Sequence, residues 1–177
     1  MSCNDLYEVR SAVIQALQEL YDKDRYLIFN RPRDYDKEAN HVSERSIVFR
    51  FGVYLCNICS DKGPLKFYDI DAEYNRNIYD RKNLPGYPNG TYPDLIVHKR
   101  GGNERNLLVA EFKTWWNSDR SNDVRRIKKF MAQKGNYRYR LGLSVLLNSG
   151  GVDLDWFYHS ENGIANCKQV LLLGAKA

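Results

Sequence analysis

The sequence lacks any apolar run of about 18 residues, and its first ten residues, MSCNDLYEVR, carry acids in place of the apolar stretch of a signal peptide. We therefore expect a cytoplasmic protein with no membrane partner. Neither a GxxxxGKS/T loop nor a GxSxG elbow occurs, so a Walker-type phosphate site and a serine hydrolase have no support. Histidine is scarce, with three residues, and none has the spacing of a zinc finger.

Cysteine is also sparse, with four residues: Cys3, Cys56, Cys59 and Cys167. Cys56 and Cys59 form a CxxC without a second close pair, which argues against structural zinc. If both lie on one helix, they are about one turn apart, and we expect them in the core. The four cysteines suit a reducing compartment as buried small apolar residues.

The chain is long enough to bury a core of its own. Its 177 residues are 43% hydrophobic and 28% charged, which predicts one domain over residues 1–177. The net charge of +5 and the pI near 9.0 favour a polyanionic partner. Tyrosine is frequent, with 13 residues, and the segment NYRYR at 136–140 either binds nucleic acid through rings and guanidinium groups or enters a strand.

Apolar periodicity predicts a mixed α/β order. Ser43 is expected to cap a helix that begins after it. Helices are expected over 5–22, 43–59 and 121–135, strands over 65–75, 94–98, 107–113, 140–148, 152–159 and 168–174, and open loops over 25–40 and 76–92. This order predicts an α/β fold with a mixed central sheet flanked by helices, its core covering about residues 43–160.

The hairpin over 94–113 is the candidate site. An antiparallel hairpin brings Asp94, at the start of its first strand, beside Glu111 at the end of its second. Lys113 shares a strand face with Glu111, because residues two apart point the same way. Two carboxylates at a sheet edge suit Mg²⁺, which polarises a phosphodiester and activates water. The alternative is a plain Glu–Lys pair with an aspartate that caps a turn.

At Pro93-Asp94 and Glu111-Phe112-Lys113, the sequence resembles the PD-(D/E)xK nuclease superfamily, which has the restriction-endonuclease-like fold. The order of elements over residues 43–148 is similar to the helix, three strands, helix and strand of that core. More narrowly, DIDAEYNR, YPDLIVHKRG and NLLVAEFK resemble a group of small stand-alone bacterial or phage proteins. The TWW that follows Lys113 departs from the polar residues usual there, and its tryptophans either stack on a base or cover the sheet.

The resemblance implies a Mg²⁺- or Mn²⁺-dependent nuclease, with DNA favoured over RNA as substrate. Asp94 and Glu111 would bind the metal with the carbonyl of Phe112, and Lys113 would position the attacking water. Glu44, on the first core helix, matches a further glutamate of many members. A homodimer is compatible with this class. The alternative is a catalytically inactive module of the same fold that binds protein or nucleic acid.

Other charged residues have weaker patterns. Glu73 ends the strand before the hairpin, where it either approaches the metal or pairs with Arg76 or a neighbour. Basic residues follow the candidate site on the next helix and at the next strand, where they either contact phosphates or form a solvated face. The candidate nucleic-acid-binding residues are Arg125, Arg126, Lys128, Lys129, Arg138 and Arg140.

Overall fold

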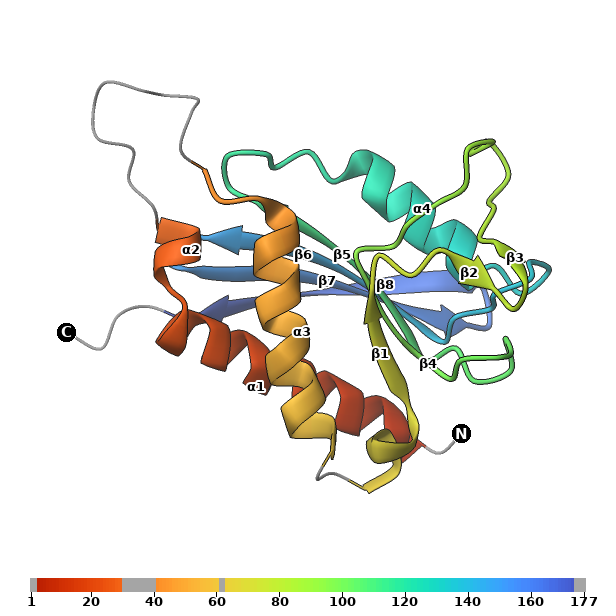
Figure 1. Cartoon of the computed structure of the whole chain (residues 1–177), viewed down its shortest axis with the longest axis horizontal. Coiled ribbons are helices and arrows are strands. Elements are labelled where there is room, and N and C mark those ends of the chain that lie inside the picture. The colour runs from red at the N-terminus through yellow and green to blue at the C-terminus, as the bar shows by residue number, and fades with distance from the viewer. Residues whose placement is uncertain (1–2, 30–40, 61–62, 174–177) are drawn as a thin grey trace.

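The fold is a six-stranded mixed sheet with helices on both faces (Figure 1). The computed structural model describes residues 3–29, 41–60 and 63–173. The strand order is β1-β4-β5-β6-β7-β8, with β5 and β6 parallel and every other neighbouring pair antiparallel. The strands are β1 Asp69–Ala72, β4 Leu95–His98, β5 Leu108–Thr114, β6 Leu141–Asn148, β7 Gly151–Ser160 and β8 Gly163–Leu172.

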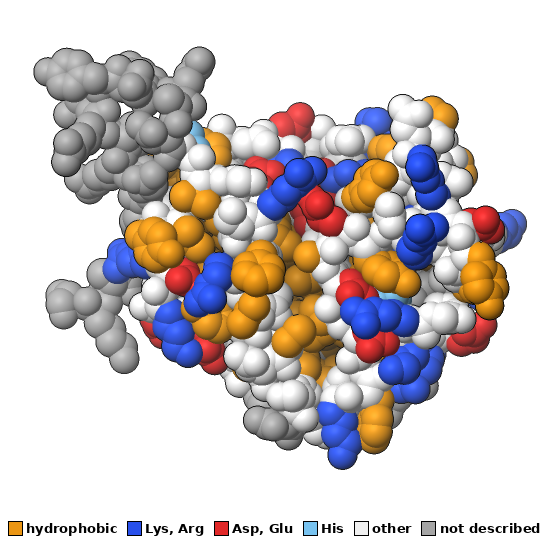
Figure 2. Space-filling model, in the orientation of Figure 1, with side chains coloured by type: hydrophobic (Ala, Val, Ile, Leu, Met, Phe, Trp, Pro, Cys, Tyr) orange, Lys and Arg blue, Asp and Glu red, His pale blue; other side chains and the backbone are white. Residues whose placement is uncertain are grey.

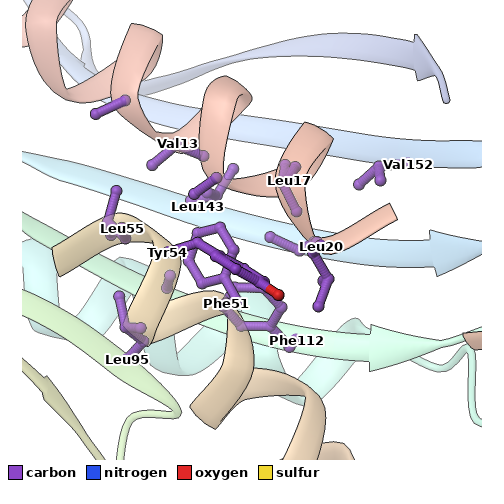
Figure 3. Packing of buried hydrophobic residues seen from close by; sticks show 14 of the residues in the cluster. Val13, Leu17, Leu20, Phe51, Tyr54, Leu55, Leu95, Phe112, Leu143 and Val152 are labelled. Carbon is purple, nitrogen blue, oxygen red and sulfur yellow. The ribbon is translucent and has the colours of Figure 1, made fainter. Parts of the chain in front are cut away.

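Helices α1 (Cys3–Lys23) and α3 (Glu44–Ser60) cover one face of the sheet. Figure 3 shows Leu17 and Leu20 of α1 and Phe51 of α3 directed at the same layer as Phe112 and Leu143 of the sheet. Their spacing of three and four residues along each helix builds the apolar stripe that this face buries. Ser43 caps α3 as predicted, since its Oγ accepts the N–H of Arg45 at 3.3 Å.

Helix α4 (Ser121–Met131) covers the opposite face, as the crossover between the parallel strands β5 and β6. Ile127, Phe130 and Met131 pack there with Ile96 and Val109 of the sheet. The sheet lies between this cluster and the α1–α3 core, which confirms the predicted mixed α/β sandwich. Strand β5 is consequently buried along most of its length, and the Glu111 carboxyl on it is held away from bulk water, whereas Lys113 is partly exposed.

The ends of several elements differ from prediction. The strand expected over 65–75 is only β1, because residues Gly63–Phe67 form a 3₁₀ turn and the positive φ of Glu73, 48°, ends the pairing. The helix expected over 121–135 ends at Met131, because Ala132 is already extended. The edge strand β8 starts earlier than expected, after a tight turn in which Gly163 has a φ of 114°.

Two segments predicted as loops contain short elements. Within 25–40, residues Tyr26–Phe29 form the one-turn helix α2, and residues 30–40 lie outside the described ranges. Within 76–92, β2 (Arg76–Asn77) pairs with β3 (Asp80–Arg81) in a small hairpin. Across the described ranges, no helix combines the length and the apolar content needed to cross a bilayer.

The cysteines correct another expectation. Cys59 is buried in the core as predicted, but Cys56 and Cys167 are exposed. Cys56 and Cys59 are three residues apart on α3 and so lie about 60° apart around the helix axis, with Cys59 inside the buried stripe and Cys56 at its exposed margin. The side chain of Cys3 lies outside the described set.

Candidate active site

Strand register places Asp94 beside Glu111. Leu95 of β4 pairs with Ala110 of β5, so Asp94 lies opposite Glu111 and Pro93 lies opposite Phe112. The Asp94 Oδ2 accepts the N–H of Phe112 at 2.7 Å. Proline has no N–H to donate, and the N–H and C=O of one residue in a strand point to the same side. The carbonyl of Phe112 therefore points to the same side of β5 as its N–H, and Pro93 has no N–H to donate to it.

Glu111 is buried with an incomplete set of partners. Its side chain accepts a bond from the Arg126 guanidinium, with 2.5 Å between Nη2 and Oε2, and the residue is 1% exposed. Among the described residues, no group hydrogen-bonds to its Oε1. Burial and the neighbouring Asp94 carboxylate raise the pKa of Glu111 well above its ordinary 4.5, and the Arg126 charge opposes them. This carboxyl is therefore one that a cation would strongly stabilise in its ionised form.

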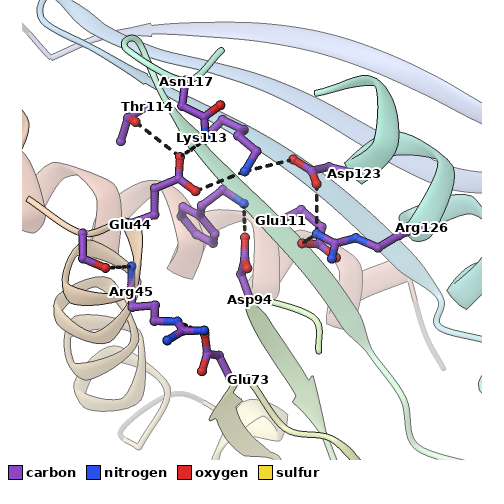
Figure 4. A network of polar contacts seen from close by, with 12 residues as sticks. Glu44, Arg45, Glu73, Asp94, Glu111, Lys113, Thr114, Asn117, Asp123 and Arg126 are labelled. Carbon is purple, nitrogen blue, oxygen red and sulfur yellow. Dashed lines mark hydrogen bonds and ion pairs between the residues drawn. The ribbon is translucent and has the colours of Figure 1, made fainter. Parts of the chain in front are cut away.

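Glu44 holds Lys113 from the first turn of α3. The Lys113 Nζ donates to the Glu44 carboxylate at 3.1 Å, and Asn117 Nδ2 and Thr114 Oγ1 donate to its other oxygen at 3.1 and 3.4 Å (Figure 4). Burial lowers the pKa of Lys113, but the Glu44 bond and the charge of Asp123 raise it more, so its pKa lies above 10.5. Lys113 is consequently an ammonium at neutral pH.

Helix α4 contributes two further charged groups. Arg126 Nη2 donates to Asp123 Oδ1 at 2.9 Å, and Asp123 Oδ2 lies 3.8 Å from Lys113 Nζ (Figure 4). The sequence interpretation missed Asp123, which is buried. Its position four residues before Ile127 places it on the inward face of the helix, and that spacing is the signal that could have identified it. Arg126, predicted to bind phosphate, instead joins two carboxylates of the site.

The site has more carboxylates than cations. Glu44, Asp94, Glu111 and Asp123 face two cations, Lys113 and Arg126, which would leave two formal negative charges with every group ionised. Burial is the largest cause that raises the pKa of Asp94 and of Asp123 above 3.8. This surplus matches the charge of one divalent cation.

The oxygen ligands of the site fit Mg²⁺ or Mn²⁺ better than a metal that prefers nitrogen or sulfur ligands. Within the described ranges, no three His, Cys, Asp or Glu side chains are grouped closely enough to form an all-protein metal site. Mg²⁺ keeps several waters and commonly takes only one or two protein carboxylates. Asp94, Glu111 and the Phe112 carbonyl would supply such a set, and the Glu111 Oε1 without a donor is the buried atom that a cation would satisfy.

A cleft of about 500 Å³ opens beside these charges. Its lining comes from α3, the end of β1, the segment before β4, and α4, and comprises Glu44, Arg45, Val48, Ala72, Glu73, Tyr92, Asp94 and Arg126. Glu73 pairs here with Arg45, at 2.6 Å, and not with Arg76. Figure 2 shows acidic and basic side chains side by side on this face, next to one end of α3. Solvent and small ligands can thus approach Asp94 from this side.

The remaining basic candidates lie outside the cluster. Arg125 and Lys128 are exposed on α4, and Lys129 donates to the Pro85 carbonyl while its ammonium lies over the Tyr87 ring.

Arg138 and Arg140 precede β6, whose first residue Leu141 pairs with Leu108, and so lie toward the far end of β5 from Lys113.

Trp116 stacks on His41 at 4.4 Å, while Trp115 donates its indole N–H to the Ile28 carbonyl and remains 43% exposed. Trp116 also packs against the core between the sheet and helices α1 and α3.

Comparison of the chain with protein-family models, curated proteins and solved structures finds no match in any of the three.

Proposed function

We propose that this protein hydrolyses phosphodiester bonds of nucleic acid, with DNA favoured over RNA, and that its sheet is of the restriction-endonuclease-like type. The observation that carries the proposal is the placement of Asp94 opposite Glu111, with Lys113 on the same strand face and a surplus of negative charge around them. That arrangement provides oxygen ligands and an ammonium where β4 begins and β5 ends, between two interior strands of the sheet.

Asp94, Glu111 and the Phe112 carbonyl would hold Mg²⁺ or Mn²⁺, which supplies Lewis-acid polarisation of the phosphate and a more acidic bound water. Lys113, which its ion pair with Glu44 favours as an ammonium, would position the attacking water by donating to its oxygen. Glu44 keeps the ammonium in place through its 3.1 Å bond. Lys113 can also donate to the negative charge that develops on the phosphate.

The test is cleavage of labelled DNA and RNA with Mg²⁺ or Mn²⁺, each compared with the same reaction in EDTA. We expect Asp94→Asn and Lys113→Ala to lower the rate by at least about 100-fold. Lys99→Ala is the matched control, because Lys99 is an exposed lysine that pairs with Asp69 outside the cluster, at 3.3 Å. Cleavage that persists in EDTA, or in both site variants, would contradict the proposal.

A second candidate is a nucleic-acid-binding module without catalysis. It is favoured by the guanidinium of Arg126, which already bridges Glu111 and Asp123. In that case the wild-type protein binds DNA without cutting it, and neither Mg²⁺ nor Mn²⁺ raises its thermal stability. A metal-dependent rise in melting temperature that Asp94→Asn removes would favour the nuclease.

A further inference from the structure

The cleft beside Asp94 has the features of a binding pocket for one planar ring. Its volume of about 500 Å³ lies in the range of small-molecule pockets, and charged side chains make up five of its eight lining residues. Val48 and Ala72 supply apolar surface, and Tyr92 adds an aromatic ring that is 44% exposed. Tyr92 lies two residues before Asp94, so whatever stacks on this ring lies next to the proposed reaction centre.

An ion pair forms another part of the wall. Arg45 Nε contacts Glu73 Oε1 at 2.6 Å, and the Arg45 side chain remains 80% exposed. The pair presents guanidinium donors and a carboxylate acceptor together, and the edges of the nucleobases carry both donors and acceptors. It can therefore hydrogen-bond to different bases without demanding one sequence.

The backbone fixes this wall to the reaction centre. Glu73 has a φ of 48°, in the left-handed region that a non-glycine residue adopts only at a cost. Its N–H donates to the Asp94 carbonyl at 3.2 Å. The backbone of Glu73 thus holds the Glu73–Arg45 ion pair next to Asp94, the proposed metal ligand.

We propose that this cleft receives one unpaired nucleotide whose base stacks on Tyr92, so that the substrate is single-stranded nucleic acid or a frayed end and not an intact duplex. A base inside a duplex is stacked on both faces and paired along one edge. It must leave the stack before an aromatic side chain can stack on it. This inference rests on the proposed nuclease function, since it places the unpaired nucleotide beside the phosphate to be cut.

Binding without turnover tests the inference separately from catalysis. An oligodeoxynucleotide that contains 2-aminopurine would be titrated with the protein in EDTA, and both fluorescence and affinity would be measured. We expect stacking to quench the fluorescence and Tyr92→Ala to weaken single-strand binding by about tenfold, or about 1.4 kcal/mol. Tyr92→Phe keeps the ring and should bind as the wild type does. Tyr7→Ala, at an exposed tyrosine of α1, is the matched control.

Two outcomes overturn the inference: single-strand affinity that Tyr92→Ala leaves unchanged, or tighter binding to a blunt duplex than to the single strand. Failure of the nuclease proposal has a different signature, namely no metal-dependent cleavage while the loss of single-strand binding in Tyr92→Ala remains. That second result would support the cleft as a binding site for an unpaired nucleotide.

Discussion

Replacing Glu111 with glutamine should stabilise the metal-free protein while it removes activity. The pKa of Glu111 is raised well above 4.5 in the folded state, chiefly by burial and by Asp94. Between the unfolded and folded pKa values, the folded state therefore holds more protons than the unfolded state. The free energy of unfolding must fall as the pH rises through that window, by about 1.4 kcal/mol per pH unit for one group.

Glutamine has nearly the same shape as glutamate and does not ionise, so the free energy of unfolding of the variant does not fall with pH through this group. Asp94 and Asp123 also have raised pKa values and remain in the variant, so a comparison with the wild type reports the contribution of Glu111 together with its interaction with Asp94. Urea denaturation in EDTA at a series of pH values above 4.5 should show the variant gaining stability over the wild type until the folded pKa of Glu111 is passed. Glu161→Gln, at an exposed glutamate, is the control.

A stability difference that stays constant with pH, or one that shrinks as the pH rises, would refute the reasoning. Mg²⁺ provides a second readout, because a ligand that binds only the folded state stabilises it by mass action. Added Mg²⁺ should raise the stability of the wild type more at high pH than at low pH, since the carboxyl must lose its proton to bind the ion. The same addition should have little effect on Glu111→Gln.

Three further substitutions test packing, hydrogen bonding and electrostatics elsewhere in the fold. Gly142→Ala should destabilise the fold by about 1–3 kcal/mol and lower the cleavage rate, because the new Cβ would lie 2.2 Å from Ile127 Cγ2 and displace α4; urea denaturation and a cleavage assay measure both. Tyr21→Phe should cost about 1–3 kcal/mol in the same denaturation, because it removes the one phenol O–H that the carbonyls of Gly151 and Asn148 share, at 2.6 and 2.8 Å. Burial lowers the pKa of Lys82 from 10.5 to about 8, so the wild type should gain about 1.4 kcal/mol per pH unit over that interval as the charge is lost, and Lys82→Met should not.

Helices and strands with a clear apolar periodicity were predicted correctly. Predictions failed at residues whose backbone conformation leaves no such periodicity. The α1 stripe and the alternation of β7 were visible as periods of 3.6 and 2 residues. Glu73 was predicted to end the strand before the hairpin. Its left-handed backbone could not be predicted from periodicity, because glutamate rarely adopts that conformation. The hairpin of β2 and β3 consists of four paired residues, too few for alternation to be seen.

The part of the candidate site that lies within one hairpin could be predicted from the sequence. The part contributed by a separate helix could not. Asp94, Glu111 and Lys113 belong to one hairpin, whose register follows from antiparallel pairing. The part contributed by α4 depends on which side of that helix faces the sheet. Grouping Arg125, Arg126 and Lys128 as candidate nucleic-acid ligands hid this, because Arg126 lies three residues after buried Asp123 while Arg125 and Lys128 are exposed.

The cost of the carboxylates is itself an argument for function. A glutamate on a strand buried on both faces could be replaced by a neutral residue of similar shape at a gain in stability, as partly compensated buried charges often can. Arg126 offsets only part of the cost, since Glu111 Oε1 has no donor among the described residues and three carboxyl pKa values are raised. Packing alone therefore does not account for Asp94, Glu111 and Asp123 in one cluster. A bound divalent cation would lower those pKa values and remove the penalty, so the same residues that weaken the metal-free fold would strengthen the metal-bound one.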